Sequence, residues 1–134
     1  FNLMAAAKSG MEPNGCGSRS LFSHPEPSTS NIIVENGDIS YKEMIADIEE
    51  GILLESVLGM GQGNILSGAF SNPLGIAYKI EKGKVVGRVK DGQIAGNIYD
   101  LLQNIHSIAN NGKWFWGRFY CPHIRMDNIP TVGK

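Results

Sequence analysis

Residues 67–89 read SGAFSNPLGIAYKIEKGKVVGRV, and this stretch decides the fold class that the sequence predicts. Residues 67–71 and 74–80 read as extended segments. Residues 81–84 then form a turn, in which Gly83 supplies a positive φ angle, and residues 85–89 return as the second arm of a hairpin. Glycine makes up 17 of the 134 residues, against an average of roughly 7%, which indicates many tight turns.

Two helices are expected on either side of this stretch. Ser40 and Glu43 form the pattern of a capping box, and an apolar stripe follows, so we expect a helix over residues 40–50 that ends at Gly51. A second helix is expected to begin at the N-cap Asn97. Its expected buried stripe consists of Ile98, Leu101, Leu102, Ile105, Ile108 and Ala109, and the sequence Asn110-Asn111-Gly112 would end it.

Further strands are expected around these helices, at residues 31–35, 52–58, 114–121 and 123–126. Pro122 marks a bulge or an edge between the last two, because proline cannot donate to a sheet ladder. The predicted fold class is therefore α+β, an antiparallel, barrel-like β-sheet with two packed helices.

The chain length fits a single domain, residues 1–134, with an irregular arm at residues 1–30. This arm is rich in Gly, Pro and Ser and is either an arm or linker that serves another part of a larger protein or a disordered end. The first residue is Phe1 and not Met, so we expect the chain to be part of something longer.

Charge, hydropathy and cysteine content limit the partners and the cellular compartment that the sequence predicts. The net charge is −1, which gives no global field to attract nucleic acid or anionic lipid. No stretch approaches the roughly 18 apolar residues that a membrane span needs. Cys16 and Cys121 are too few for a disulfide framework, which favours a reducing, cytoplasmic compartment.

No organised catalytic site is apparent from motif spacing. A zinc peptidase needs two imidazoles on one helical face with a carboxylate base, whereas His24, His106 and His123 stand apart. Cys121 and His123 lie two residues apart, but two ligands do not close a zinc site. None of the serines sits in a G-x-S-x-G elbow. The glycine loop at residues 59–64 lacks the spacing of a dinucleotide cradle and reads as a mobile connection.

Residues 113–120, KWFWGRFY, interleave aromatic and basic side chains. Such a face could stack single-stranded bases. Alternation along a strand would place Trp114 and Trp116 on one side and Phe115 and Phe119 on the other, so we expect packing in the core or in an interface instead.

Several short strings follow one another in order over nearly the whole chain. They read NGCGSR (14–19), SGAFS (67–71), IEKGK (80–84), IAGN (94–97), IANN (108–111), PHIRMDNI (122–129) and TVG (131–133). Taken together, these strings resemble the motifs of the TldD/PmbA family, once described as modulators of DNA gyrase.

The resemblance implies a two-domain parent of which this chain is the carboxy-terminal domain. TldD-type subunits of the family carry HExxxH and a carboxy-terminal cysteine that hold zinc, and this chain has neither pattern, so it looks closer to the PmbA (TldE) type. The family implies a cytoplasmic TldD–TldE heterodimer that cleaves unfolded or extended peptides. The implied partners are its own amino-terminal domain, a TldD-like subunit that carries the zinc and extended peptide substrates, with no cofactor in this chain.

We therefore expect a non-catalytic scaffold or substrate-channel domain of a metallopeptidase complex. The residues expected to contact substrate or partner are Gly61, Gly63, Phe70, Asn97, Trp114 and Trp116. The alternative is a nucleic-acid-binding module linked to modulation of DNA gyrase, although nucleic acid and membrane are not the expected partners. A third class, an independent enzyme, finds no organised site in the sequence.

Overall fold

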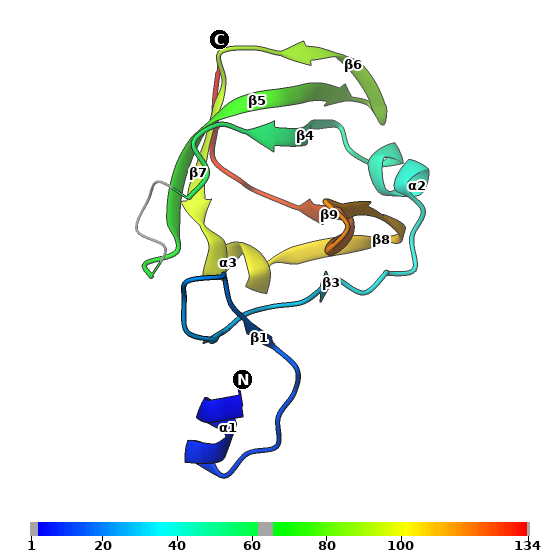
Figure 1. The fold of residues 1–134 in the computed structure, drawn as a ribbon. Helices are drawn as coiled ribbons and strands as arrows, with labels where there is room; N and C mark the ends of the chain where they lie inside the picture. The colour runs from blue at the N-terminus through cyan, green and yellow to red at the C-terminus, as the bar shows by residue number, and fades with distance from the viewer. Residues whose placement is uncertain (1–2, 62–65, 134) are drawn as a thin grey trace. The chain divides into compact units, whose positions relative to one another are not determined.

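The structure is a computed structural model, and it describes residues 3–61 and 66–133 (Figure 1). The chain divides into two compact units: unit 1 comprises residues 1–35 and 113–121, and unit 2 comprises residues 36–112 and 122–134. The elements are α1 (Leu3–Ser9), β1 (Gly17–Ser18), β2 (Glu26–Pro27), β3 (Ile32–Ile33), α2 (Tyr41–Ala46), β4 (Glu50–Val57), β5 (Ala69–Glu81), β6 (Lys84–Val89), β7 (Gln93–Asn97), α3 (Ile98–Gln103), β8 (Ile105–Phe115), β9 (Phe119–Met126) and β10 (Thr131–Val132).

A five-stranded antiparallel sheet organises unit 2, and β5 is its longest strand. The strand order is β10-β7-β5-β4, and β6 pairs with β5 as well. The two extended segments predicted at residues 67–71 and 74–80 form one strand, which Figure 1 shows beside β4 and β6. The predicted hairpin is confirmed: Glu81 pairs with Lys84 across a turn in which Lys82 and Gly83 have φ angles of 47° and 73°.

Helix α2 confirms the predicted capping box but is shorter than expected. The Ser40 hydroxyl accepts a hydrogen bond from the Glu43 amide, and the Glu43 carboxylate accepts one from the Ser40 amide. The helix ends at Ala46 with Asp47 as its C-cap, so the prediction that it continues to residue 50 and ends at Gly51 is wrong. The reason is tertiary: the amides of Lys82 and Gly83 bond the carbonyls of Glu49 and Ile48, and β4 begins at Glu50.

Helix α3 begins as predicted at Asn97 but stops at Gln103, and the second half of the predicted helix is strand β8. The Asn104 side chain bonds the Asp100 carbonyl and its amide bonds the Leu101 carbonyl, which closes the helix. Beyond it, Ala109 forms a parallel bridge with Ile39. None of the α3 residues is fully buried, so the predicted buried stripe is wrong for Ile98, Leu101 and Leu102, whereas Ala109 is buried as predicted but lies in β8.

A three-stranded sheet has the order β3-β9-β8, and its strands β8 and β9 contribute residues to both units. The β3–β9 pairing is parallel, with Ile32 opposite Phe119 and Ile33 opposite Tyr120, so the sheet system is not wholly antiparallel. The predicted strand over residues 114–121 is interrupted, because the chain turns at Trp116 and Gly117, which have φ angles of 49° and 68°. Pro122 lies within β9, two residues beyond the last residue that pairs with β3.

The irregular arm predicted for residues 1–30 contains more structure than the sequence suggests. It includes helix α1 and the short antiparallel pair of β1 and β2, in which Gly17 pairs with Pro27. The amide of Ser28 donates to the Cys16 carbonyl beside this pair.

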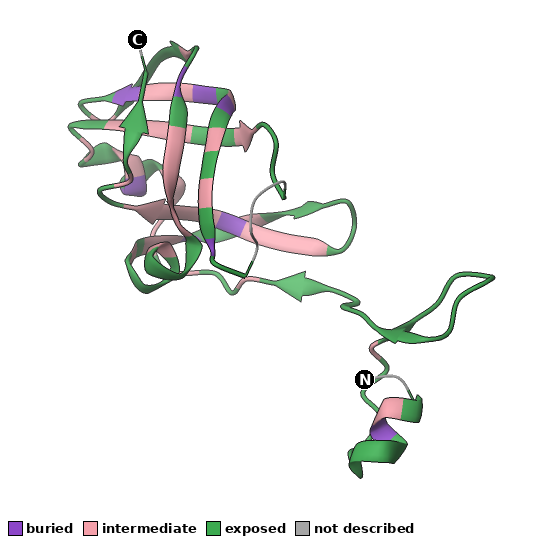
Figure 2. Cartoon of the chain, turned by 90° about the vertical axis from the view of Figure 1, so that its left-hand side faces the viewer, coloured by how far each residue is buried: buried purple, intermediate pink, exposed green. Residues whose placement is uncertain are grey.

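Buried apolar side chains concentrate in unit 2 (Figure 2). Met44, Leu74, Ala77, Ile80 and Ala109 are buried there, whereas Ala6 of α1 is buried in unit 1. The α+β class is confirmed, with open sheets among the described residues, so a barrel-like closure is not confirmed. Within residues 3–61 and 66–133, no helix combines the length and the apolar character that crossing a membrane requires.

Candidate functional site

Two of the predicted contact residues, Phe70 and Asn97, come together where β5 and β7 pair at the start of α3. The Asn97 side-chain oxygen accepts a hydrogen bond from the Tyr99 amide at 2.9 Å, and its amide group donates to the Ser67 carbonyl at 2.9 Å. Phe70 pairs with Gly96, where a Cβ would stand 3.1 Å from the Phe70 ring. Asn97 therefore acts as a helix cap and a tether, and Gly96 leaves room for Phe70.

The sequence did not reveal the two residues that complete this corner, Gly68 and Tyr99. Gly68 has a φ of 69°, and a Cβ there would stand 2.6 Å from the Tyr99 ring. The Gly68 carbonyl accepts the Ile98 amide at 2.8 Å, and the Tyr99 hydroxyl donates to the Leu66 carbonyl at 3.5 Å. Two local signals in the sequence could have identified Gly68 and Tyr99. Gly68 directly precedes a strand, and Tyr99 is an aromatic residue in the first turn after an N-cap.

The connection between β4 and this corner carries the remaining predicted glycines. Gly61 is exposed with a φ of 85°, and a Cβ there would meet no atom within 4 Å. Gly63 lies outside the described residues. Position 61 therefore favours glycine because of its positive φ angle, and not because a neighbouring atom would clash with a side chain.

The predicted tryptophans belong to unit 1, at the turn between β8 and β9. We call this region the aromatic hairpin end, which consists of Trp114, Phe115, Trp116, Phe119 and Tyr120. The Trp114 and Tyr120 rings lie 5.4 Å apart, and the Phe115 ring lies 6.3 Å from Trp116 and 6.2 Å from Phe119.

The aromatic hairpin end does not fill a core of this chain. Trp116 is 90% exposed and Trp114 is 54% exposed, so the expectation of core packing is wrong for these two residues. The physical reason is the left-handed backbone at Trp116, which turns the chain where a continuous strand would have alternated its side chains. The expectation of packing in an interface stays a prediction.

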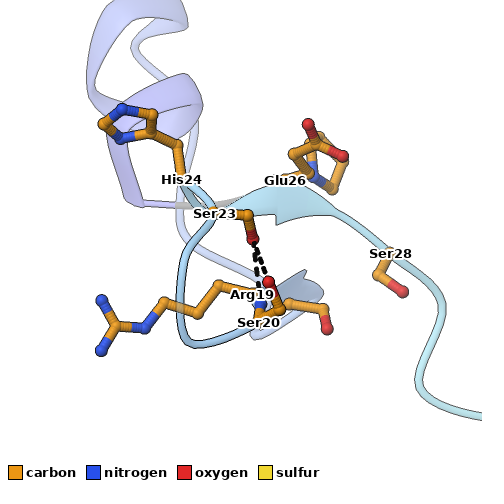
Figure 3. A pocket seen from close by; sticks show the side chains of 8 residues that line it. Arg19, Ser20, Ser23, His24, Glu26 and Ser28 are labelled. Atoms are coloured by element: carbon orange, nitrogen blue, oxygen red, sulfur yellow. Dashed lines mark hydrogen bonds between the residues drawn. The ribbon is translucent and has the colours of Figure 1, made fainter.

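A second feature of unit 1 is an open, polar hollow of about 240 Å³ beside the β1–β2 pair (Figure 3). The Ser23 hydroxyl accepts hydrogen bonds from the Ser20 amide at 2.9 Å and from the Ser20 hydroxyl at 3.1 Å. The side chains of Arg19 and His24 do not point toward one another in Figure 3. The hydrogen bonds between Ser20 and Ser23 hold the loop that lines this hollow.

The side chains present do not fit a zinc site. Among the residues that the structure describes, no group of three His, Cys, Asp or Glu side chains could hold a metal ion. The His123 ring lies against the Tyr41 ring, with centroids 4.6 Å apart. Burial raises the pKa of the Cys121 thiol, which disfavours the thiolate that zinc binds.

Arg125, which no motif in the sequence marked, forms a charged cluster in unit 2. Its guanidinium lies 2.6 Å from an Asp47 carboxylate oxygen and 3.0 Å from an Asp127 carboxylate oxygen, and it donates to the Met44 carbonyl at 3.3 Å. These contacts join β9 to the end of α2 and to the residue after β9. Because Asp47 is 78 residues away in the sequence, spacing offered no signal for this cluster.

Comparison with known proteins identifies relatives along the whole described chain. Residues 1–133 match the family model described as the PmbA/TldA metallopeptidase C-terminal domain. A metalloprotease of Methanothermobacter thermautotrophicus is 30% identical over 96% of this chain and 30% of the relative. A TldD homologue of Haemophilus influenzae is 31% identical over 97% of this chain and 30% of the relative.

Solved structures that resemble this chain belong to proteins with related names. TldE from Thermococcus kodakarensis superposes with a TM-score of 0.83 at 30% identity, over 96% of this chain and 29% of that one. A protein of Thermotoga maritima described as a modulator of a DNA gyrase gives a TM-score of 0.78 at 29% identity, over 98% of this chain and 29% of that one. The chain thus spans about 30% of the length of the curated relatives it matches.

Proposed function

This chain belongs to the PmbA/TldD metallopeptidase family, and from that premise we propose that it is a non-catalytic scaffold and substrate-channel domain of a metallopeptidase complex. The complex cleaves extended peptides in the cytoplasm. Its zinc is held by a TldD-like subunit, and this chain serves as the carboxy-terminal domain of a longer, two-domain partner. Gly61, Gly63, Phe70, Asn97, Trp114 and Trp116 are its proposed contact residues.

The observation that carries this proposal is the apolar surface of unit 1. Its exposed large apolar residues are Leu3, Met4, Met11, Leu21, Phe22, Ile32, Ile33, Trp114, Phe115 and Trp116. We take these exposed apolar side chains as candidates for contact with other polypeptide. The relatives extend well beyond the matched part, and in our proposal the rest of a longer parent protein covers these side chains.

We propose that extended peptide adds to the outer edge of β4. In the described chain, β4 has a partner strand only on its β5 side, and Glu50 to Leu54 pair regularly before a register shift. A second edge strand, β6, also has a register shift and carries Lys84 and Arg88, features that discourage strand addition, and the edge strand β10 (Thr131–Val132) is only two residues long. The segment from Glu50 to Leu54 therefore offers the regular edge that a peptide backbone can use.

A reconstitution assay tests the proposed function. This chain with added zinc is expected to cleave no extended peptide, whereas the complete complex cleaves it. Methylation of backbone amides in the substrate is expected to raise KM roughly tenfold, because each methyl group removes a donor that strand addition needs. Zinc-dependent cleavage by this chain alone would overturn the non-catalytic role.

A nucleic-acid-binding module linked to DNA gyrase is the second candidate, and one observation favours it. Trp116 is 90% exposed and stands between Lys113 and Arg118, as in surfaces that stack single-stranded bases. Binding of a single-stranded oligonucleotide that falls steeply with salt and is lost in Trp114→Ala would support it. No binding at low salt would exclude it.

A further inference from the structure

The chain contains three Asn-Gly pairs, and the structure gives them different surroundings. They are Asn14-Gly15, Asn36-Gly37 and Asn111-Gly112. At such a pair a protein can react with itself, because glycine has no side chain to keep its backbone nitrogen away from the side-chain carbon Cγ of the preceding asparagine. The rate of this reaction depends on whether the glycine amide is already hydrogen-bonded and on how near the two atoms are held.

Asn14 and Gly15 are exposed and lie between α1 and β1. The Cys16 amide donates to the Oδ1 atom of Asn14 at 3.2 Å. This hydrogen bond closes a ring that contains both Cγ of Asn14 and the backbone nitrogen of Gly15, so it keeps these two atoms together. The same bond stabilises negative charge that develops on Oδ1 during an attack on Cγ. Within the described part of the chain, no hydrogen bond engages the Gly15 amide.

The other two Asn-Gly pairs are held by strand β8. The Gly37 amide donates to the Ala109 carbonyl at 2.9 Å, and a Cβ at Gly37 would clash with the Ile108 carbonyl oxygen. The Gly37 nitrogen must therefore lose a hydrogen bond and move away from β8 before it can attack. Asn111-Gly112 lies within β8 itself, and the five-membered ring that the attack forms does not fit an extended strand.

We propose that Asn14 is a site of spontaneous modification, at which the Gly15 nitrogen converts it to aspartate and isoaspartate through a succinimide. Hydroxide removes the Gly15 amide proton, and the nitrogen forms a bond to Cγ of Asn14. The bond from Cγ to Nδ2 breaks, and the side-chain nitrogen leaves as ammonia with a proton taken from water. A second water molecule then opens the ring. Opening at Cγ gives aspartate, and opening at the main-chain carbonyl carbon gives isoaspartate.

The product differs from asparagine in charge and in the length of the main chain. A carboxylate replaces a neutral amide, and isoaspartate adds one carbon atom to the backbone. The change lies next to Cys16, whose carbonyl accepts the Ser28 amide at 2.7 Å beside the β1–β2 pair. This chemistry needs only water, so it goes beyond the proposed function and does not depend on it.

The test is incubation of the folded protein in a mildly alkaline buffer, followed by tryptic digestion and mass spectrometry. Cleavage after Lys8 and Arg19 releases residues 9–19, in which Asn14 is the only asparagine or glutamine. Conversion raises the mass of this peptide by about 1 Da, and chromatography separates its aspartate and isoaspartate forms. A sample digested at time zero corrects for conversion during digestion.

Asn14 is expected to react about tenfold faster than Asn36 in the folded protein, because Gly37 must first lose its hydrogen bond. In concentrated urea, which removes these surroundings, the two rates are expected to agree within about twofold. The comparison separates the effect of the fold from the effect of the Asn-Gly sequence, which both sites share.

Two glycine variants form a matched pair. Gly15→Ala places a methyl group next to the attacking nitrogen and is expected to slow conversion of Asn14 about tenfold. Gly10→Ala is the control, because Gly10 and Gly15 have φ angles of 67° and 72° and a Cβ at either would meet no atom within 4 Å. Both variants therefore carry a similar backbone cost, and Gly10→Ala is expected to leave the rate unchanged.

Three results would overturn the proposal. Equal rates at Asn14 and Asn36 in the folded protein would show that the surroundings do not select the site. Aspartate without isoaspartate would show direct hydrolysis of the side chain by water, with no succinimide. An unchanged rate in Gly15→Ala would show that the Gly15 nitrogen is not the attacking atom. Circular dichroism verifies that each variant retains its fold.

Discussion

The two units differ in where they place their apolar side chains. In unit 2 Met44, Leu74, Ala77 and Ile80 are buried. In unit 1 the buried residue is Ala6, and residues as large as Phe22 and Trp116 are exposed. Since apolar burial is the main favourable contribution to folding, we expect unit 2 to contribute more to the stability of the chain than unit 1.

Under the proposed function, this difference means that unit 2 is the folded platform and unit 1 presents the surface for assembly. Unit 2 also carries the charged cluster around Arg125 and the turn at Gly83, which pack α2 onto the sheet. A Cβ at Gly83 would stand 2.5 Å from the Ala46 carbonyl oxygen, so the contact of the β5–β6 turn with α2 requires glycine there. Substitutions should therefore change folding in unit 2 and association in unit 1.

The largest effect on folding is expected for Met44→Ala in unit 2. Met44 is 3% exposed, and truncation of a buried methionine leaves a cavity that costs about 2–5 kcal/mol. The free energy of unfolding, measured by urea titration with far-ultraviolet circular dichroism, is expected to fall within that range. Tryptophan fluorescence is the wrong probe here, because Trp114 and Trp116 both belong to unit 1. A loss below about 0.5 kcal/mol, typical of surface changes, would show that unit 2 lacks the core described.

Local signals in the sequence predicted the start of each helix in unit 2 and the β5–β6 turn. The capping box at Ser40 and Glu43, the cap at Asn97 and the glycine at 83 each act within a few residues. The sequence could not predict where the helices end. Ile105, Ile108 and Ala109 fit helical spacing, but Ala109 pairs with Ile39, and a contact across 70 residues leaves no local pattern.

In the candidate site, too, the sequence predicted local features but not contacts between distant residues. The pairing of β5 with β7 brings Phe70 next to Gly96 and Asn97. The extended segment at Phe70 was predicted, whereas strand β7 and its register with β5 were not. The aromatic residues at 114–116 were predicted to matter, but their placement was not, because a tryptophan with positive φ is uncommon and gives no sequence signal. The parallel pairing of Ile32 with Phe119 is a long-range contact of the same kind.

A smaller effect is expected at the α2 cap, where stability should depend on pH. Hydrogen bonds from the Ser40 side chain and backbone lower the pKa of Glu43. A carboxyl group with a lowered folded-state pKa stabilises the fold above its unfolded pKa and loses that contribution as pH falls through the folded pKa. Ser40→Ala should cost about 1 kcal/mol near neutral pH.

The measurement is the midpoint of thermal unfolding between pH 7 and pH 3 for wild type and Ser40→Ala. The gap between the melting midpoints of the two proteins is expected to narrow as the medium becomes acidic, because the Ser40 side chain, which only the wild type has, is the largest cause of the lowered pKa of Glu43, and protonation of Glu43 removes that contribution. Lys42→Ala changes an exposed residue next to the cap without touching either hydrogen bond, so it serves as the control. A gap that stays constant down to pH 3 would contradict a contribution from the Glu43 carboxylate.

The smallest effect on folding is expected for Phe22→Ala in unit 1, although it removes a whole aromatic ring. Phe22 is 100% exposed, so the folded chain loses no apolar burial when the ring is deleted. The free energy of unfolding should change by less than about 0.5 kcal/mol, measured by tryptophan fluorescence because both tryptophans report on unit 1. A loss above 1 kcal/mol would mean that the ring is buried within this chain in solution, and unit 1 would then have a core of its own. The contrast between the two units would no longer hold, and the apolar surface of unit 1 could not be attributed to assembly.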